Sequence, residues 1–312
     1  MTDSDTFKLM FRQPWLLFIL LLVLFGSACS KEPAEPVYPD LRDSHDPEFQ
    51  AELDAALADR PMFWDGVKKH DLTVVIADVT DLEHPSVAWY NPELMLYAAS
   101  LPKIAIALGA LVEVDLGHLE LDEELHQQLV NMIKRSSNKD ATAVFNKVGV
   151  ERLKEILQDE RYGKLYDPER GGGLWCGKSY SKDSSVQRDP LKKLSHGASA
   201  IQAARFYYGY LNGTILDHKY LPLLKEMFGS PGIKHKFVKG MEGRDVQVYR
   251  KSGTWGDFHA DSGVFVRDDL TYIVVAVRQN RPEAGSDGIT GIRIVDDLML
   301  ERAARRKSDA GR

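Results

Sequence analysis

The sequence predicts an α+β protein in which one antiparallel sheet is built from both ends of the chain, with a helical region inserted between them. Two strand-like runs, rich in β-branched and aromatic residues, lie within residues 72–91, and three more lie within residues 245–279. Helical spacing of apolar residues dominates the chain between these runs. This order differs from the strand–helix alternation that is typical of a parallel α/β sheet.

The individual elements follow from hydrophobic periodicity and from turn residues. Helices are expected over residues 47–60, 100–114, 122–136, 140–149, 150–157, 197–211 and 291–306. Strands are expected over residues 72–79, 86–91, 245–253, 260–267 and 271–279. A loop rich in glycine, proline and charge fills residues 161–190, and loops of that length are often functional.

The composition is that of an ordinary globular protein. The 312 residues are 44% hydrophobic and 28% charged, with a formal net charge of −6. A chain of this length can bury a sizeable core, and its mildly acidic balance gives no electrostatic footprint for a nucleic-acid partner. The sequence contains no phosphate-binding glycine loop and no Cys/His cluster, so we expect no cofactor and no metal. We also expect a monomer.

The first thirty residues differ from the rest of the chain. Lys8 and Arg12 precede an apolar run at residues 15–25, and small residues follow at 26–30. A basic start, a short apolar core and small residues are typical of a secretory signal. The run is shorter than the about 20 residues that cross a bilayer comfortably. A membrane anchor that is never cleaved is the alternative.

The segment Gly26 to Cys29 resembles the lipoprotein box of bacteria, in which the cysteine is lipidated and becomes the new N-terminus. Gly26 departs from the box, because an apolar residue such as leucine is usual there. The resemblance implies a signal segment at 1–28 and attachment of Cys29 to a lipid membrane. Residues 29–45, rich in proline and charge, are expected to form an extended tether. A folded domain at 46–306 and a tail at 307–312 complete the organisation.

Three short motifs follow in order along the folded part. Ser100 to Lys103 opens an expected helix, Ser136 to Asn138 falls between two expected helices, and Lys251 to Gly253 ends a late strand. Residues three apart share a helix face, so Lys103 can bring its amine to the Ser100 hydroxyl and activate it. Each motif also has a plain structural reading: a helix cap, a connection between helices, and an exposed edge lysine.

In this order the motifs resemble Ser-x-x-Lys, Ser-Asp-Asn and Lys-Thr-Gly of the serine β-lactamase and penicillin-binding protein superfamily, and the chain is most similar to class A β-lactamases. The resemblance implies that Ser100 is the nucleophile, Lys103 its base, Ser136 a proton relay and Lys251 a second positive charge. It further implies an oxyanion hole from the backbone N–H groups of Ser100 and Thr254. The residues implied in substrate binding are Asn138, Ser252, Gly253 and Thr254.

Several features depart from class A. Ser137 and Ser252 replace Asp and Thr in the second and third motifs, and the short interval from Ser100 to Ser136 implies a reduced helical region and an open site.

Class A enzymes deacylate with a glutamate in a loop that resembles Glu-Pro-Glu-x-x-Asn. The nearest match here places Asp167 in that position, with Glu169 as the other candidate. Aspartate is one methylene shorter and would hold a water less well. A proline turn with solvated carboxylates is the alternative.

The sequence therefore predicts an exported, lipid-anchored active-serine hydrolase of the class A β-lactamase type, which forms an acyl-enzyme with a β-lactam amide and faces the periplasm of a bacterial cell envelope. The alternatives are a DD-peptidase of low activity on peptidoglycan peptides that end in D-Ala-D-Ala, and a non-catalytic lipoprotein that binds cell-wall peptides. No Gly-x-Ser-x-Gly motif supports a Ser-His-Asp triad. His259 is a candidate binding residue, and Cys176 is expected to be structural.

Membrane attachment through Cys29 can be tested directly. Replacement Cys29→Ala should move the protein from the detergent phase to the aqueous phase in a phase-partitioning assay, because it removes the only predicted site of lipidation. If the two forms partition alike, the apolar segment at 15–25 is itself the anchor, or the protein is not anchored at all.

Overall fold

The computed structural model describes residues 36–182 and 185–310. The expected signal segment and Cys29 lie outside the described residues. None of the helices in the described part of the chain is long and apolar enough to cross a membrane.

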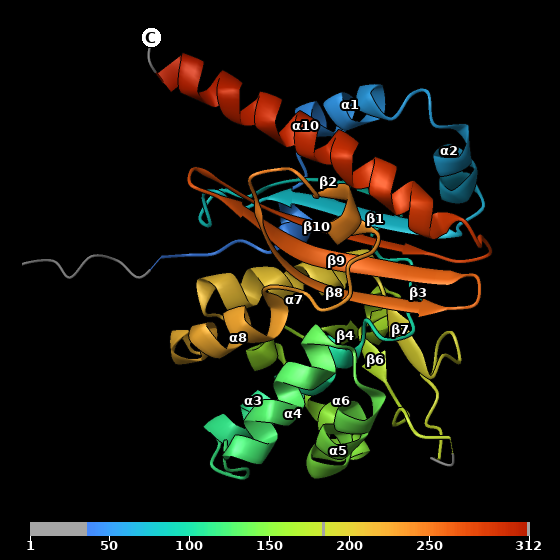
Figure 1. Ribbon diagram of the computed structural model, residues 1–312, viewed down its shortest axis with the longest axis vertical. Coiled ribbons are helices and arrows are strands. Elements are labelled where there is room, and N and C mark those ends of the chain that lie inside the picture. Colours follow the sequence, from blue (N-terminus) through green and yellow to red (C-terminus); the bar gives the residue numbers. More distant parts are fainter. Residues whose placement is uncertain (1–35, 183–184, 311–312) are drawn as a thin grey trace, which may run out of the picture. The chain divides into compact units, whose positions relative to one another are not determined.

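Five strands form the central antiparallel sheet, in the order β2-β1-β10-β9-β8 (Figure 1). Their bounds are β1 Leu72–Asp78, β2 Ser86–Tyr90, β8 Gln247–Trp255, β9 Phe258–Arg267 and β10 Leu270–Arg278. The first strand therefore pairs with the last, in a register that runs from Leu72 opposite Arg278 to Asp78 opposite Tyr272. The predicted α+β fold, with one sheet built from both ends of the chain, is confirmed.

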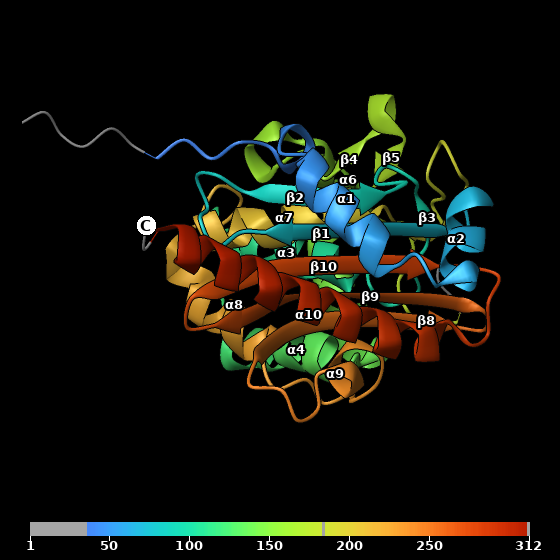
Figure 2. The ribbon, with the colours of Figure 1, turned by 90° about the horizontal axis from the view of Figure 1, so that it is seen from above.

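Helices cover both faces of this sheet (Figures 1 and 2). On one side lie α1 Pro47–Ala56, α2 Pro61–Lys68, the short α9 Phe237–Gly240 and the long α10 Ala284–Ala310. On the other lie α3 Lys103–Asp115, α4 Glu123–Lys134, α5 Asn138–Val148, α6 Val150–Gln158, α7 Ala200–Asn212 and α8 Leu221–Phe228.

Several short elements were not expected from the sequence. Besides α2 and α8, they include the strands β3 Leu96–Tyr97, β4 Tyr166–Asp167, β5 Gly172–Gly173, β6 Trp175–Cys176 and β7 His196–Ala198. The strands β3, β7 and β6 form a second small sheet, and β4 pairs with β5. Strands of two or three residues are too short to show a period of two. Three of them, β4, β5 and β6, lie within the loop predicted at 161–190.

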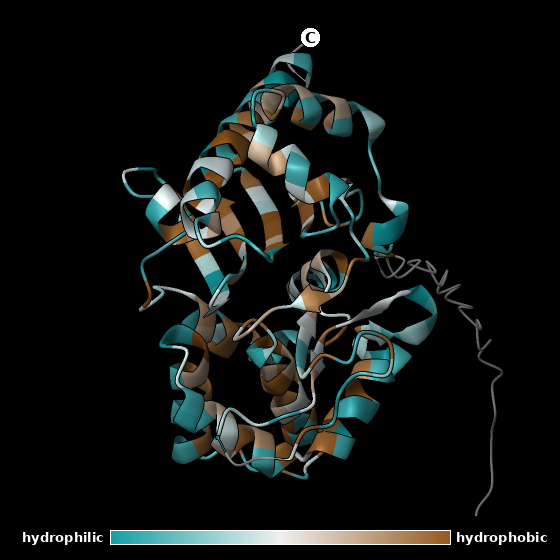
Figure 3. Cartoon of the chain, turned by 90° about the vertical axis from the view of Figure 1, so that its right-hand side faces the viewer, coloured by the Kyte–Doolittle hydropathy of each residue, from teal (hydrophilic) through white to brown (hydrophobic). Residues whose placement is uncertain are grey.

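The sheet separates two hydrophobic cores. Val75 and Val275 belong to the core shared with the inserted helices, whereas their neighbours Val74 and Val274 belong to the core shared with α10. Successive strand residues point to opposite faces, so continuous apolar runs such as Leu72–Asp78 are what a sheet buried on both sides requires. In Figure 3 the brown, hydrophobic segments accordingly extend along the central strands.

One buried carboxylate joins α10 to the sheet. Asp296 is fully buried and accepts hydrogen bonds from Arg244 at 2.5 Å, from Arg267 at 2.7 Å and from the Tyr272 hydroxyl at 2.6 Å. Burial alone would raise the pKa of Asp296, but the hydrogen bonds from Arg267, Tyr272 and Arg244 outweigh it, and the pKa lies below its ordinary value.

Replacement Asp296→Asn should destabilise the fold by about 3–5 kcal/mol, because it leaves buried arginine charge without its partner. The neighbouring Asp297, which is largely exposed and also pairs with Arg244, supplies the control: Asp297→Asn should cost less than about 1 kcal/mol. Because the folded-state pKa of Asp296 is below its unfolded value, its contribution is present above the ordinary carboxyl range and is lost as the pH falls. Urea unfolding at neutral and acidic pH measures both effects, and equal costs for the two variants would contradict the assignment.

Candidate active site

Ser100 lies in the tight turn between β3 and α3. The backbone before it adopts a left-handed conformation at Ala99, with φ of +49°, and the helix begins only at Lys103, with Pro102 as its N-cap residue. The Ser100 hydroxyl therefore does not cap the helix, and the reading of Ser100 as a helix cap is wrong. The strand-to-helix turn leaves the hydroxyl available for chemistry.

The amine of Lys103 lies at the centre of a buried network. The side chain has no solvent exposure, and Nζ donates to the Ser136 carbonyl oxygen and to Asn138 Oδ1, both at 2.7 Å. Ser136 Oγ lies 3.4 Å away. A neutral amine has two N–H groups, which the two bonds of 2.7 Å would satisfy, and one lone pair, which can accept a proton from a hydroxyl. Burial lowers the pKa of Lys103 to about 7, which favours that neutral form near neutral pH.

The second motif forms the start of α5. Ser136 has a φ of +55°, which turns the chain sharply between α4 and α5. Ser137 is the N-cap residue, and its hydroxyl accepts a hydrogen bond from the backbone N–H of Asp140 at 3.2 Å. Aspartate and serine are both strong N-cap residues, so this role explains why serine suffices where the family has aspartate. The cap thereby holds Ser136 and Asn138 against Lys103.

The third motif brings a second buried lysine to the same hydroxyl. Lys251 Nζ donates to Ser136 Oγ at 2.9 Å and to the carbonyl oxygen of Ser252 at 2.6 Å. The side chain is buried, so the reading of Lys251 as an exposed edge residue is wrong. Burial, together with the positive charges of Lys103 and Arg250, holds the pKa of Lys251 well below its ordinary value. Two lysines therefore share one serine hydroxyl, and at least one of them is readily deprotonated.

Gly253 packs directly against the turn that carries Ser100. A Cβ atom built on Gly253 would lie 2.1 Å from the carbonyl oxygen of Ala98 and 2.8 Å from the backbone nitrogen of Ser100. Only glycine allows this approach. The contact brings the backbone of Ser100 next to the strand that carries Thr254, as an oxyanion hole built from these two N–H groups requires.

Tyr180, which the sequence analysis missed, covers Lys103 from the long loop. Its ring centroid lies 4.4 Å from Lys103 Nζ, and its hydroxyl donates to the carbonyl oxygen of Ala99 at 2.9 Å. His196 packs on the ring, with centroids 4.5 Å apart. The tyrosine thus fixes the turn before Ser100 and excludes solvent from the lysine amine. Only the length of the loop signalled that it could be functional.

Lys236 is the second residue that the sequence analysis missed. It is buried, and its Nζ donates to the carbonyl oxygens of Gly253 and Ala260, at 2.7 and 3.0 Å, and to Thr254 Oγ1 at 2.8 Å. Burial lowers the pKa of Lys236 to about 8. The ammonium group braces the strand pair next to Ser100 and adds positive charge to the site.

Of the remaining candidates, the carboxylates and His259 lie apart from this network, whereas the Cys176 thiol interacts electrostatically with Lys103. Asp167 is the N-cap of a single 3₁₀ turn: it accepts from the backbone N–H of Glu169 at 3.1 Å and lies 3.9 Å from Lys164 Nζ. Among the described residues, neither the Asp167 nor the Glu169 carboxylate contacts Ser100 or Lys103. Cys176 is buried, and burial raises the pKa of its thiol to about 12. His259 faces α10 rather than Ser100.

The contact between Tyr180 and Lys103 has a measurable consequence. Replacement Tyr180→Leu keeps an apolar cover but removes the aromatic face, which stabilises an ammonium by about 0.5–2 kcal/mol. The pKa of Lys103 should then fall by about 0.4–1.5, since one pKa unit corresponds to about 1.4 kcal/mol. Titration of ¹³C-labelled lysine by NMR checks this. Tyr180→Phe, which retains the ring, should leave the pKa close to that of the wild type, and a rise in the leucine variant would contradict the assignment.

No protein-family model matches the chain, and no curated protein matches it. The fold, however, is shared with solved structures. A β-lactamase from Sphaerobacter thermophilus superposes with a TM-score of 0.58 at 15% identity, over 81% of this chain and 95% of that chain. A class A β-lactamase representative from Bacteroides cellulosilyticus gives 0.61 at 16% identity, over 82% and 98%. A mutant of PBP-A, solved as an acyl-enzyme complex with penicillin G, gives 0.60 at 15% identity, over 85% and 100%. The chain thus has the fold of the serine β-lactamases and penicillin-binding proteins.

Proposed function

We propose that the protein is an active-serine acyl transferase that reacts with β-lactam amides through Ser100. The observation that carries this proposal is the buried network of Lys103, Ser136 and Lys251, which meets the Ser100 turn through Gly253. A protein that only binds has no need of two desolvated lysines on one serine hydroxyl. The shared fold supports the proposal, as does the PBP-A relative, which forms an acyl-enzyme with penicillin G.

The network can perform each step of acylation. The neutral amine of Lys103 takes the proton of the Ser100 hydroxyl, and Oγ bonds to the carbonyl carbon of the lactam. The backbone N–H groups of Ser100 and Thr254 stabilise the oxyanion. When the C–N bond breaks, Ser136 donates its proton to the leaving nitrogen and is reprotonated by the ammonium of Lys103. Lys103 is thereby neutral again, and Ser100 carries the acyl group.

The charges of the site favour an anionic substrate. Lys251 and Lys236 are both buried beside the third motif, whereas the nearest buried carboxylate, Asp261, already pairs with Arg250 at 2.6 Å. A substrate carboxylate next to the scissile amide would stabilise the protonated form of these lysines, whose pKa values burial lowers. β-Lactams and the C-terminal D-Ala of peptidoglycan peptides both carry a carboxylate in that place.

A second candidate function, that of a DD-peptidase or penicillin-binding protein with slow hydrolysis, is favoured by Tyr180. An aromatic ring, not a carboxylate, lies against Lys103, and Asp167 is held by the backbone of its own turn. Without a base that positions water, the acyl-enzyme would persist. We further propose, from the N-terminal sequence alone, that the protein is lipid-anchored in a bacterial cell envelope and faces the periplasm.

Incubation with a fluorescent penicillin tests the proposal. The wild type should gain one covalent label, which peptide mapping places on Ser100, and Ser100→Ala should gain none. Lys103→Met should slow labelling by about 10²–10⁴-fold, because the general base is lost. Ser179→Ala, which removes the serine of a Ser-x-x-Lys copy in the long loop, serves as the matched control and should label as the wild type does. Labelling that survives in Ser100→Ala would refute acylation at this residue.

The decay of the label then separates the two candidate functions. Loss of label within seconds indicates a β-lactamase, and retention for hours indicates a penicillin-binding protein. If Asp167 is the deacylating residue, Asp167→Ala should prolong the label, and an unchanged decay would exclude that role.

A further inference from the structure

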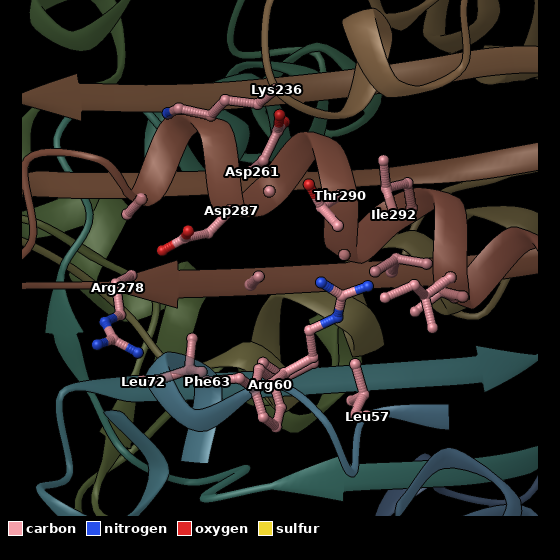
Figure 4. Close-up of a pocket in the computed structure, with 18 of the residues that line it drawn as sticks. Leu57, Arg60, Phe63, Leu72, Lys236, Asp261, Arg278, Asp287, Thr290 and Ile292 are labelled. Atoms are coloured by element: carbon pink, nitrogen blue, oxygen red, sulfur yellow. The ribbon is translucent and has the colours of Figure 1, made fainter. Parts of the chain in front are cut away.

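We propose that a cavity between α10 and the outer face of the sheet binds a slender amphiphile, an aliphatic chain that ends in a carboxylate, such as a medium-chain fatty acid. The cavity measures about 310 Å³, within the range of small-molecule sites. It lies on the face of the sheet opposite the inserted helices that carry the first two motifs (Figures 1 and 4). Binding of such a ligand does not depend on the proposed acyl transfer.

The cavity exists because α10 presents little side chain to the sheet along its first three turns. Ala284, Gly288 and Gly291 lie on one helix face, at spacings of four and three residues. A Cβ atom on Gly288 would meet its first neighbour, Lys236, only at 3.7 Å, and a Cβ atom on Gly291 would meet nothing within 4 Å. A slot therefore remains between this helix face and the buried sheet residues, where an ordinary helix would fill the space with side chains.

The cavity is longer than it is wide. Its lining on α10 runs from Ala284 to Val295, which is about 16 Å at 1.5 Å per residue. A sphere of 310 Å³ would be only about 8 Å across. The elongated shape suits an extended aliphatic chain better than a compact ring system.

Buried polar groups without partners gather at one end of the cavity. His259 and Arg278 face each other across β9 and β10, so their side chains lie on the same face of the sheet. Among the described residues, the Nε atom of Arg278 is buried without a hydrogen-bond partner. The buried ring nitrogens of His259 have one acceptor within reach, the backbone of Pro282, which leaves the other nitrogen unpaired. Unsatisfied buried donors are costly, and a ligand acceptor would relieve them.

The charge of that end favours a carboxylate as the acceptor. Among the described residues, no carboxylate lies within ion-pair distance of Arg278. Its guanidinium donates one described hydrogen bond, to the Met62 carbonyl oxygen. Asp287 and Asp261, which also line the cavity, already pair with Arg281 and Arg250. Burial and the charge of Arg281 lower the pKa of Arg278, and the carboxylates of Asp287, Asp71 and Asp65 offset this only in part, from beyond ion-pair distance. The N-terminus of α10 lies at the same end and adds positive potential.

The opposite end is apolar. In Figure 4 Arg278 and Asp287 mark one end of the slot, whereas Leu57 and Ile292 mark the other. Ile76 and Val295 also line the cavity, and the Arg60 guanidinium lies over the slot on the side of Leu57. A polar end that is rich in unpaired donors and an apolar end together define an amphiphile with one negative head group.

A ligand bound in the cavity should also alter the geometry of the active site. Lys236 lines the cavity, and its amine bonds to Gly253, Thr254 and Ala260. Gly253 in turn packs on the backbone of Ser100. A ligand that displaces Lys236 therefore acts on the strand that would form the oxyanion hole.

Isothermal titration of the purified protein with sodium decanoate, kept below its aggregation concentration, tests the site. We expect one molecule bound per chain, and at least about tenfold weaker binding of decan-1-ol and of decylammonium, because a charge-assisted hydrogen bond is lost or reversed. The methyl NMR signals of Ile76, Val274, Ile292 and Val295 should shift on binding. Equal affinity for the three probes, or shifts confined to other residues, would overturn the proposal.

Filling the cavity gives the decisive variant. Gly291→Leu places a side chain in open space and improves helix propensity, so the protein should stay folded while decanoate affinity falls at least about tenfold. Arg278→Gln should lose the preference for decanoate over decan-1-ol, whereas Lys69→Gln, which removes one positive charge from the end of α2, should keep it. Undiminished binding in a folded Gly291→Leu would refute the site. Decanoate should change the rate of penicillin labelling in the wild type and not in Gly291→Leu, and an unchanged rate in the wild type would refute the coupling.

Discussion

The structure depends on burying several basic side chains next to one another. Lys103, Lys236, Arg250 and Lys251 are all buried around the end of β8. Within the described part of the chain, Asp261 is the one buried carboxylate that forms an ion pair with any of them, with Arg250. An ammonium group leaves water only if its N–H groups find acceptors. Backbone carbonyl oxygens supply most of these acceptors: those of Ser136, Ser252, Gly253 and Ala260 each receive a lysine N–H. The positions of these carbonyl oxygens therefore set the positions of the catalytic candidates.

That requirement explains the unusual backbone around the site. Ala99, Ser136 and Lys236 all have positive φ values, a conformation that non-glycine residues seldom adopt. At Ser136 the turn directs both the carbonyl oxygen and the hydroxyl toward the lysines, and at Ala99 it directs the carbonyl oxygen toward the Tyr180 hydroxyl. Strained backbone that persists at a buried polar cluster is a common mark of a functional site, because the surrounding contacts must over-determine it.

The sequence was sufficient for the sheet, because strands rest on local pattern: the β-branched runs at residues 72–79 and 271–279 predicted β1 and β10. The order of the three motifs predicted one site. The structure joins Lys103, Ser136 and Lys251 in one hydrogen-bonded network, whereas the role of Ser100 stays a prediction. Tyr180 and Lys236 could not be predicted in the same way. Tyr180 lies in a loop without periodicity, and Lys236 precedes a helix of four residues, so only the tertiary contacts with Lys103 and Gly253 reveal either one.

The strand pair β8–β9 serves two chemically distinct surfaces, because strand residues alternate in direction. Lys251 points toward Ser136, whereas its neighbour Arg250 points the other way, to Asp261 and toward the side where the cavity lies. Lys236 is the residue that crosses between these surfaces: its Cβ faces Gly288 of α10, and its amine ends on the carbonyl oxygen of Gly253. Gly253 has no freedom to absorb a shift, because it touches the backbone of Ala98 and Ser100. Packing against α10 is therefore mechanically connected to the geometry of the nucleophile through Lys236 and Gly253.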